Sequence, residues 1–259
     1  MRPDTNLSVV IPCFNERGNL RPLLAEIHEV LDRLGYSWEV IITDDASIDG
    51  SWEEMQVIAA EDRNLRVQRL KRNSGETAAS WAGMQAARGD VIITIDADLQ
   101  NDPREIPKFL EALGNCDLVC GTRIQSRAAG DGTVKIFYSE LTNWARRRLL
   151  DDSISDSGCT FRSFRRECLR GLQPFRGMHR FLPALFKLRG YTIREIPVIH
   201  RCRSYGRSKY GIGNRLVPSF LDLLAVRWMK SRWIQIELEE GSLSVATSKS
   251  VIGHPMTVD

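Results

Sequence analysis

The sequence predicts an α/β fold in which helices cover both faces of a Rossmann-like, mostly parallel central sheet. Two observations support this prediction. Runs of β-branched residues alternate with segments of helical periodicity through the first half of the chain, as they do where a parallel sheet is covered on both faces. The informative polar clusters of that half come directly after the apolar runs, where ligands bind in sheets of this kind.

The expected elements follow one another in chain order. Strands are expected at residues 7–13, 38–43, 65–70, 91–95 and 118–121, and helices at 19–34, 51–60, 77–87 and 103–113. The first helix repeats leucine and isoleucine at helical spacing, and Pro103 suits the first turn of the fourth. The second half is less regular. Helices are expected there at 135–150, 181–188 and 216–233, and a strand at 191–200.

Composition limits the class of protein. The chain has 259 residues, of which 42% are hydrophobic and 27% charged, which suits one large domain or two small ones and excludes a disordered or fibrous chain. The apolar runs are far shorter than the roughly 18 residues of a membrane-spanning helix, and no signal-peptide pattern is present. The six cysteines form no CxxC pair, so we expect reduced, structural thiols in a cytosolic protein and no zinc site.

The net charge of +3 conceals an asymmetry. Residues 1–122 hold 12 basic and 21 acidic residues, whereas residues 123–232 hold 23 basic and 8 acidic ones. An acidic first half suits a cation and a hydroxyl-rich ligand, and a basic second half suits a phosphate, a nucleic acid or an anionic lipid surface. A merely solvated basic surface is the alternative.

The strongest chemical signal is Asp96-Ala97-Asp98-Leu99-Gln100, directly after the strand expected at 91–95. Residues two apart face the same side of an extended backbone, so Asp96, Asp98 and Gln100 are expected to present oxygens to one hard cation. Two carboxylates and an amide suit Mg²⁺ or Mn²⁺, with water and a diphosphate completing the shell. A solvent-exposed acidic turn is the alternative interpretation.

Two further polar clusters follow the first and second expected strands, at residues 12–16 and 44–49. Either cluster alone is explained by helix capping, for which Ser47 and Asp49 are suitable residue types. Capping alone does not explain three such clusters at one edge of a sheet, so the pattern favours a ligand site.

These three clusters, with Arg72-Asn73-Ser74-Gly75, resemble the nucleotide-sugar-binding motifs of family-2 glycosyltransferases with the GT-A fold, in order and spacing over residues 7–122. The second half resembles, more narrowly, the dolichol-phosphate mannose synthase group, which includes bacterial polyprenyl-phosphate sugar synthases. The segments that carry this resemblance are residues 156–162, 178–181 and 203–211.

The resemblance implies roles for residues at matching positions. Donor binding would fall to Pro12, Asn15, Glu16, Asp44, Asp45, Asp49, Asn73, Asp96 and Gln100, and metal binding to Asp96, Asp98 and Gln100. The catalytic residues would be Asp98, Asp156 and Arg123, and the acceptor phosphate would be held by His179, Arg180, Arg207, Ser208 and Lys209. Asp156 would act as a base or orient the acceptor, with a turn-forming aspartate as the alternative. A structural histidine is the alternative for His179.

The basic loop supports the acceptor assignment independently of the resemblance. Residues 201–215 contain five basic residues and no acidic one. Arg207, Ser208 and Lys209 lie between Gly206 and Gly211 and offer charge, a hydroxyl donor and a mobile backbone, which suit a phosphomonoester. No nucleic-acid-binding motif accompanies the loop, so a nucleic-acid partner is not expected.

The helix expected at 216–233 mixes leucine, phenylalanine and tryptophan with basic residues. We expect it to lie in the headgroup layer of a membrane, with a core helix or a partner-docking helix as alternatives. Arg146, Arg147 and Arg148 would add attraction to anionic lipid. The expected organisation is therefore a donor- and metal-binding half at 1–122, an acceptor-binding half of the same domain at 123–215, the interfacial helix, and a flexible tail at 234–259.

The function expected from these features is metal-dependent, inverting transfer of a hexose from a nucleoside-diphosphate sugar to a polyprenyl or dolichyl phosphate. The enzyme would sit peripherally on the cytoplasmic face of the membrane, and the sequence allows a membrane-anchoring subunit as a further partner. One alternative is a family-2 enzyme with a saccharide acceptor, and another is a non-catalytic membrane-associated binding module. A nucleotidyltransferase would want a Gly- and Lys-rich phosphate loop near the first strand, which residues 13–19 do not provide.

Overall fold

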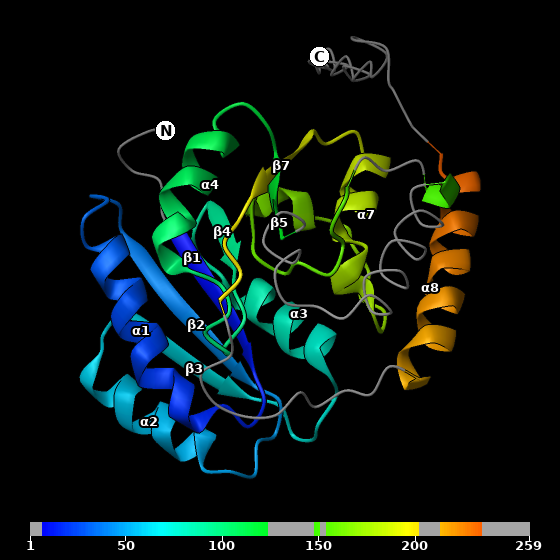
Figure 1. The fold of residues 1–259 in the computed structure, drawn as a ribbon. Coiled ribbons are helices and arrows are strands. Elements are labelled where there is room, and N and C mark those ends of the chain that lie inside the picture. The colour runs from blue at the N-terminus through cyan, green and yellow to red at the C-terminus, as the bar shows by residue number, and fades with distance from the viewer. Residues whose placement is uncertain (1–6, 124–147, 151–153, 202–212, 235–259) are drawn as a thin grey trace, which may run out of the picture.

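The computed structural model describes residues 7–123, 148–150, 154–201 and 213–234, with side chains for all of these except 213–219. Its core is one seven-stranded sheet with strand order β3-β2-β1-β4-β6-β5-β7 (Figure 1). The strands are β1 (Leu7–Cys13), β2 (Trp38–Asp44), β3 (Leu65–Arg69), β4 (Val91–Thr94), β5 (Leu118–Thr122), β6 (Arg162–Arg165) and β7 (Ile193–Pro197). β6 runs antiparallel to β4 and β5, and the other neighbouring pairs are parallel.

Helices pack on both faces of this sheet (Figure 1). One apolar cluster joins the sheet to α1 (Arg17–Leu31), α2 (Ser51–Glu61) and α4 (Ile106–Leu113). A second cluster joins the opposite face to α3 (Glu76–Ala86), α7 (Leu182–Leu188) and α8 (Gly213–Ser231). Short 3₁₀ turns occur at η1 (Pro103–Glu105), η2 (Arg166–Leu169) and η3 (Met178–Arg180).

The two clusters explain the β-branched runs of the central strands. In β1, Val9 and Ile11 face the first cluster, whereas Val10 faces the second. Successive side chains of a strand point to opposite faces, so a strand covered on both sides needs apolar residues at every position. Close packing is most evident at Gly83 of α3, where a Cβ atom would lie 2.5 Å from Cγ1 of Val10.

The fold expected from the sequence is confirmed. The nine elements expected in the first half are present, with ends displaced by a few residues. The strand expected at 191–200 is shorter, and only residues 148–150 of the helix expected at 135–150 are described, where they are helical. The five cysteines in the described part of the chain are buried, and none of them is joined to another by a disulfide.

The sequence did not predict β6. Two of its four residues are arginines, and Arg162 is 2% exposed. Its guanidinium donates to the carbonyl oxygens of His179 and Ser157. Charged residues are rarely buried, so the two arginines did not indicate a buried strand in the sequence. Its place between β4 and β5 brings residues 156–162 to the acidic turn that follows β4.

Candidate active site at the carboxyl edge of the sheet

Three turns at the carboxyl ends of β1, β2 and β4 form the site. Each turn contains one residue other than glycine with positive φ: Asn15 at 54°, Ala46 at 58° and Leu99 at 62°. Such conformations cost energy and persist where the surroundings hold them, commonly at ligand-binding sites. Because β2, β1 and β4 are neighbours in the sheet, the three turns lie along one stretch of its edge.

Reciprocal hydrogen bonds lock the first two turns together. The amide of Asn15 donates to Oγ of Ser47 at 2.8 Å, and its Oδ1 accepts from the amide of Ile48 at 2.8 Å. Asp49 accepts from the amides of Arg17 and Ser51 at 3.2 and 3.0 Å. Asn15 and Asp49 therefore fix the backbone of these two turns. The N-cap position of α2 is Gly50, one residue after Asp49, and no side chain caps the helix there.

The remaining polar residue of the first turn, Glu16, is also buried. Its carboxylate accepts from Nδ2 of Asn19 at 2.5 Å, and its amide donates to Oγ of Ser51 at 3.0 Å. Pro12 lies one residue before the end of β1, paired with Thr43 of β2. Both residues thus fix the path of the chain from β1 into α1.

The last residue of β2, Asp44, and the residue that follows it, Asp45, have different surroundings. Asp44 is fully buried, accepts from the amide of Ser47, and pairs with Nε of Arg69 at 3.1 Å. Asp45 accepts from the amides of Ser74 and Gly75 at 2.7 and 2.8 Å. Asp45 thereby fastens the segment at the start of α3 to the end of β2.

The same segment carries Asn73. Its Nδ2 donates to the carbonyl oxygen of Asp45 at 3.3 Å. Asn73 is exposed and Asp45 is 3% exposed, so the asparagine is the more accessible of these two expected donor-binding residues.

The acidic turn after β4 concentrates negative charge. Thr160 donates to Oδ2 of Asp96 at 2.5 Å, and Asp98 accepts from the amide of Gln100 at 3.2 Å. Burial raises the pKa of Asp96 to about 7, and the nearby carboxylates of Glu76 and Asp98 add to the effect. A divalent cation would relieve this repulsion, and the carboxylate and amide oxygens are ligands that Mg²⁺ and Mn²⁺ accept.

The side chains of the acidic turn would supply only some of the ligands that a cation needs. No three histidine, cysteine, aspartate or glutamate side chains converge on a metal position within the described residues. Nε2 of Gln100 lies 3.2 Å from Nε2 of His200 and donates to the carbonyl oxygen of Arg201 at 3.4 Å. Asp96, Asp98 and Gln100 would thus leave ligand positions to water or a diphosphate.

An arginine–aspartate pair closes the other side of the turn. Nε and Nη2 of Arg123 donate to the two carboxylate oxygens of Asp156 at 2.8 and 3.1 Å. Burial opposes the charge on Arg123, yet the hydrogen bonds and charge of Asp156 raise the pKa of the guanidinium above its ordinary value. The geometry favours an orienting role for Asp156 over that of a base, because its carboxylate is bound to a permanent cation.

The acceptor residues expected at η3 are held by helices on either side. Nδ1 of His179 lies 2.7 Å from Oγ1 of Thr77, and Nε2 lies 3.4 Å from Oε1 of Glu76. Arg180 pairs with Asp222 of α8 at 3.1 Å. The other three expected acceptor residues, Arg207, Ser208 and Lys209, lie outside the described residues.

A family model described as glycosyl transferase family 2 matches residues 8–172. The chain belongs to this family. It is 34% identical over 229 residues to dodecaprenyl-phosphate galacturonate synthase of Rhizobium johnstonii, a match that covers 85% of this chain and 66% of that protein. It is 38% identical over 221 residues to undecaprenyl-phosphate 4-deoxy-4-formamido-L-arabinose transferase of Pseudomonas fluorescens, covering 84% and 63%. The chain thus spans slightly less than two thirds of the length of these relatives.

Solved structures share the GT-A fold of this family-2 chain. A glucosyl-3-phosphoglycerate synthase from Mycobacterium tuberculosis matches with a TM-score of 0.63 at 20% identity, covering 89% of this chain and 81% of that one. A mannosyltransferase from Pyrobaculum calidifontis, solved with GDP-Man and Mn²⁺, matches with a TM-score of 0.61 at 17% identity, covering 90% and 66%.

Sequence reasoning gave no role to four residues of this family-2 site: Thr77, Thr160, Arg162 and Glu195. Thr160 lies inside the segment at residues 156–162 that carries the resemblance, two residues before the antiparallel strand β6. Glu195 of β7 accepts from the amides of Ser155 and Asp156 at 2.8 and 3.3 Å, and no local pattern marks a residue that acts from 40 positions away.

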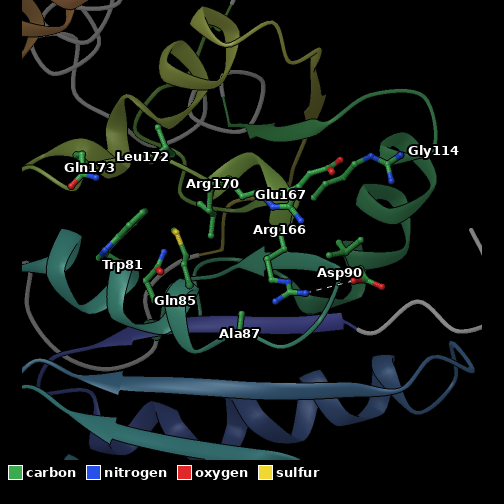
Figure 2. A pocket seen from close by; sticks show the side chains of 15 residues that line it. Trp81, Gln85, Ala87, Asp90, Gly114, Arg166, Glu167, Arg170, Leu172 and Gln173 are labelled. Carbon is green, nitrogen blue, oxygen red and sulfur yellow. Dashed lines mark ion pairs between the residues drawn. The ribbon is translucent and has the colours of Figure 1, made fainter. Parts of the chain in front are cut away.

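A cavity of about 800 Å³ lies away from this site, between α3 and residues 165–173 (Figure 2). It reaches Asp90 and Val91 at the start of β4, whereas the acidic turn follows the end of that strand. Arg166 and Asp90, two of its lining residues, form an ion pair at 3.9 Å (Figure 2). None of the residues that line the cavity belongs to the candidate site at the carboxyl edge.

The raised pKa of Asp96 predicts a pH-dependent stability in metal-free protein. Folded Asp96 keeps its proton up to about pH 7, whereas an unfolded aspartate loses it near pH 4. The free energy of unfolding therefore loses this contribution as pH rises through 7. Urea unfolding in EDTA should show Asp96→Asn to be more stable than the unsubstituted protein at pH 8, by about 1 kcal/mol or more, with a smaller difference at pH 5. An equal difference at both pH values would contradict this reading.

Proposed function

We propose that this family-2 chain transfers a sugar from a nucleoside-diphosphate donor to the phosphate of a polyprenyl lipid. The observation that carries the proposal is the crowding of carboxylates around Asp96 at the carboxyl edge of the sheet, beside turns fixed by the bonds of Asn15 and Asp45. The relatives named above are enzymes of polyprenyl phosphates, which supports the acceptor class.

The donor would lie along the three turns. Asp45 and Asn73, with the loop at residues 12–16, would bind the base and ribose. Asp96, Asp98 and Gln100 would hold Mg²⁺ or Mn²⁺. The cation would neutralise charge that develops on the leaving diphosphate.

The acceptor would need positioning more than deprotonation, because a phosphomonoester is already anionic near neutral pH. One of its oxygens would form the new bond to the anomeric carbon as the bond from that carbon to the diphosphate breaks, which inverts the configuration. Arg123 lies close enough to lower the pKa of Asp96, and its pairing with Asp156 fixes its direction. Arg123, with His179, Arg180 and the basic loop, would hold the acceptor phosphate.

Helix α8 supports a membrane surface as the place of the reaction. Leu223 and Val226 are buried against the protein, whereas Phe220, Leu221, Leu224 and Trp228 are 42–64% exposed. The outer face is therefore apolar, and Arg227 and Arg232 lie beside it, both exposed. Such a helix suits the headgroup layer of a bilayer. No described helix is long and apolar enough to cross a membrane.

The same helix is tied to the site. Asp222 pairs with Arg180, while Arg227 and Lys230 donate to the carbonyl oxygens of Leu149 and Leu150 at 2.8 and 2.7 Å. A lipid phosphate at the surface would thus lie on the side of the molecule that carries the expected acceptor residues. We propose peripheral binding at the cytoplasmic face through this helix.

A transfer assay tests the central proposal. Purified protein, Mn²⁺ or Mg²⁺, a short polyprenyl phosphate and a panel of radiolabelled UDP- and GDP-sugars should move label into the organic phase. Asp98→Ala should reduce this transfer by about 10³-fold or more, because removal of a charge-stabilising group of the transition state has costs of that order. Metal-dependent release of nucleoside diphosphate without lipid labelling would instead indicate a saccharide acceptor, and no turnover with any donor would contradict the proposed activity.

Vesicle binding tests the role of α8. Replacement of Leu224 and Trp228 by serine should lower binding to anionic vesicles roughly tenfold or more, because each buried apolar side chain contributes about 1.5–3 kcal/mol. Ser231→Ala on the same helix is the matched control and should bind as the unsubstituted protein does. Equal sedimentation of all three proteins with vesicles would rule out this face as the membrane contact.

A further inference from the structure

The chain that leaves β7 returns to the acidic turn and is bonded to it. His200 pairs with Asn101 in an isolated antiparallel bridge. The amide of Arg201 donates to the carbonyl oxygen of Gln100 at 2.9 Å. Gln100 and Arg201 lie 101 positions apart in sequence. The proposed function gives this junction no role, although it contacts an expected metal ligand directly.

The same junction orients the side chain of Gln100. Its Nε2 donates to the carbonyl oxygen of Arg201 at 3.4 Å and lies 3.2 Å from Nε2 of His200. A carbonyl oxygen accepts only from the nitrogen of a glutamine amide. This contact therefore directs Nε2 toward Arg201 and turns Oε1 to the other side of the planar amide. Oε1 is the atom that a hard cation would bind, so the backbone of Arg201 fixes the direction of that ligand.

The side chain of Arg201 anchors this backbone to two other elements. Nη1 donates to Oε2 of Glu26 on α1 at 2.7 Å, and Nη2 pairs with Oδ1 of Asp102, two residues after Gln100. The side chains of Arg201 and Glu26 are 25% and 26% exposed, so solvent screens this pair less than a pair on an open surface. The planar guanidinium presents donors in fixed directions and holds both carboxylates at once, which suits arginine better than lysine.

We propose that Arg201 is a positioning residue for the metal and the donor diphosphate. Its side chain fixes the backbone of residue 201, and that backbone fixes the carbonyl group and the side-chain amide of Gln100. The inference rests on the proposed function, because it assigns Arg201 to the expected metal site of the donor. Groups that orient metal ligands in this way contribute about 10- to 100-fold to metal affinity.

The nucleoside part of the donor would be held by different contacts. Asn15 bonds to the turn after β2, and Asp45 bonds to the start of α3, and neither contact involves Arg201. Loss of the Arg201 side chain should therefore raise the concentration of metal that nucleotide binding requires, without removing the nucleotide site. Excess metal should then restore binding. A merely structural role would instead lower binding at every metal concentration.

Nucleotide binding at increasing Mn²⁺ concentrations tests the inference without requiring turnover. Calorimetry of the full chain with UDP and with GDP identifies the nucleotide that binds more tightly. For that nucleotide, Arg201→Gln should raise the Mn²⁺ concentration for half-maximal binding about tenfold, and excess Mn²⁺ should restore binding. Arg201→Lys should show a smaller rise, because lysine keeps the charge but does not hold both carboxylates in the same way.

A second variant breaks the same contact from α1. Glu26→Ala should raise the Mn²⁺ requirement in the same direction as Arg201→Gln. The double variant should need no more Mn²⁺ than Arg201→Gln alone, because both changes remove one interaction. Thermal unfolding of each variant measures the loss of stability separately, and Glu26→Ala carries the test if Arg201→Gln does not fold.

Arg66→Gln provides the matched control. Arg66 pairs with Glu39 at 2.7 Å, with side chains 35% and 14% exposed, near the amino end of β3 and away from the site. This variant should keep the Mn²⁺ requirement of the unsubstituted protein. An unchanged requirement in Arg201→Gln and Glu26→Ala, or an equal rise in Arg66→Gln, would overturn the role of Arg201 alone. Failure of the unsubstituted protein to bind either nucleotide at any Mn²⁺ concentration would overturn that role and the proposed function together.

Discussion

The burial of Asp96, with the negative charges of Glu76 and Asp98 acting on it, is the constraint on which the site depends. Carboxylates that burial and mutual repulsion destabilise are retained when they bind a cation or a ligand. Here burial, together with the negative charges of Glu76 and Asp98, raises the pKa of Asp96. Thr160 donates to Asp96, and Nε2 of His179 lies 3.4 Å from Oε1 of Glu76.

The positive charge lies on the other side of the acidic turn. Arg123 is fixed by Asp156, which is in turn held through its amide by Glu195 of β7. Arg180 is fixed by Asp222 of α8. This arrangement gives the edge an acidic side, suited to a metal and donor, and a basic side, suited to an acceptor phosphate. It corresponds to the division of charge between the two halves of the sequence.

The extent to which the sequence predicted the site follows from how local each contact is. Residues 96–100 lie directly after a strand, so a pattern of two could place Asp96 and Asp98 together. The fold was predictable because the β-branched runs report burial on both faces. Pairs such as Thr77 with His179 join residues 102 positions apart. They depend on how η3 packs against α3, which no periodicity of either segment reveals.

The second half also shows why residue types can mislead. Arg162 is charged, yet it is buried in β6 and bonded to carbonyl oxygens. Asp156 has the residue type of a base, but its position 33 residues from Arg123 in sequence concealed the ion pair. The expected roles of Arg207, Ser208 and Lys209 stay predictions, because these residues lie outside the described part of the chain.

The most direct test of the account is a crystal structure of the full chain with Mn²⁺ and a nucleoside diphosphate, with the cation located by its anomalous scattering. The account predicts one Mn²⁺ in contact with the carboxylates of Asp96 and Asp98 and with the diphosphate, and the nucleoside beside Asp45 and Asn73. A cation bound away from Asp96 and Asp98, or a nucleotide bound at another edge of the sheet, would contradict it.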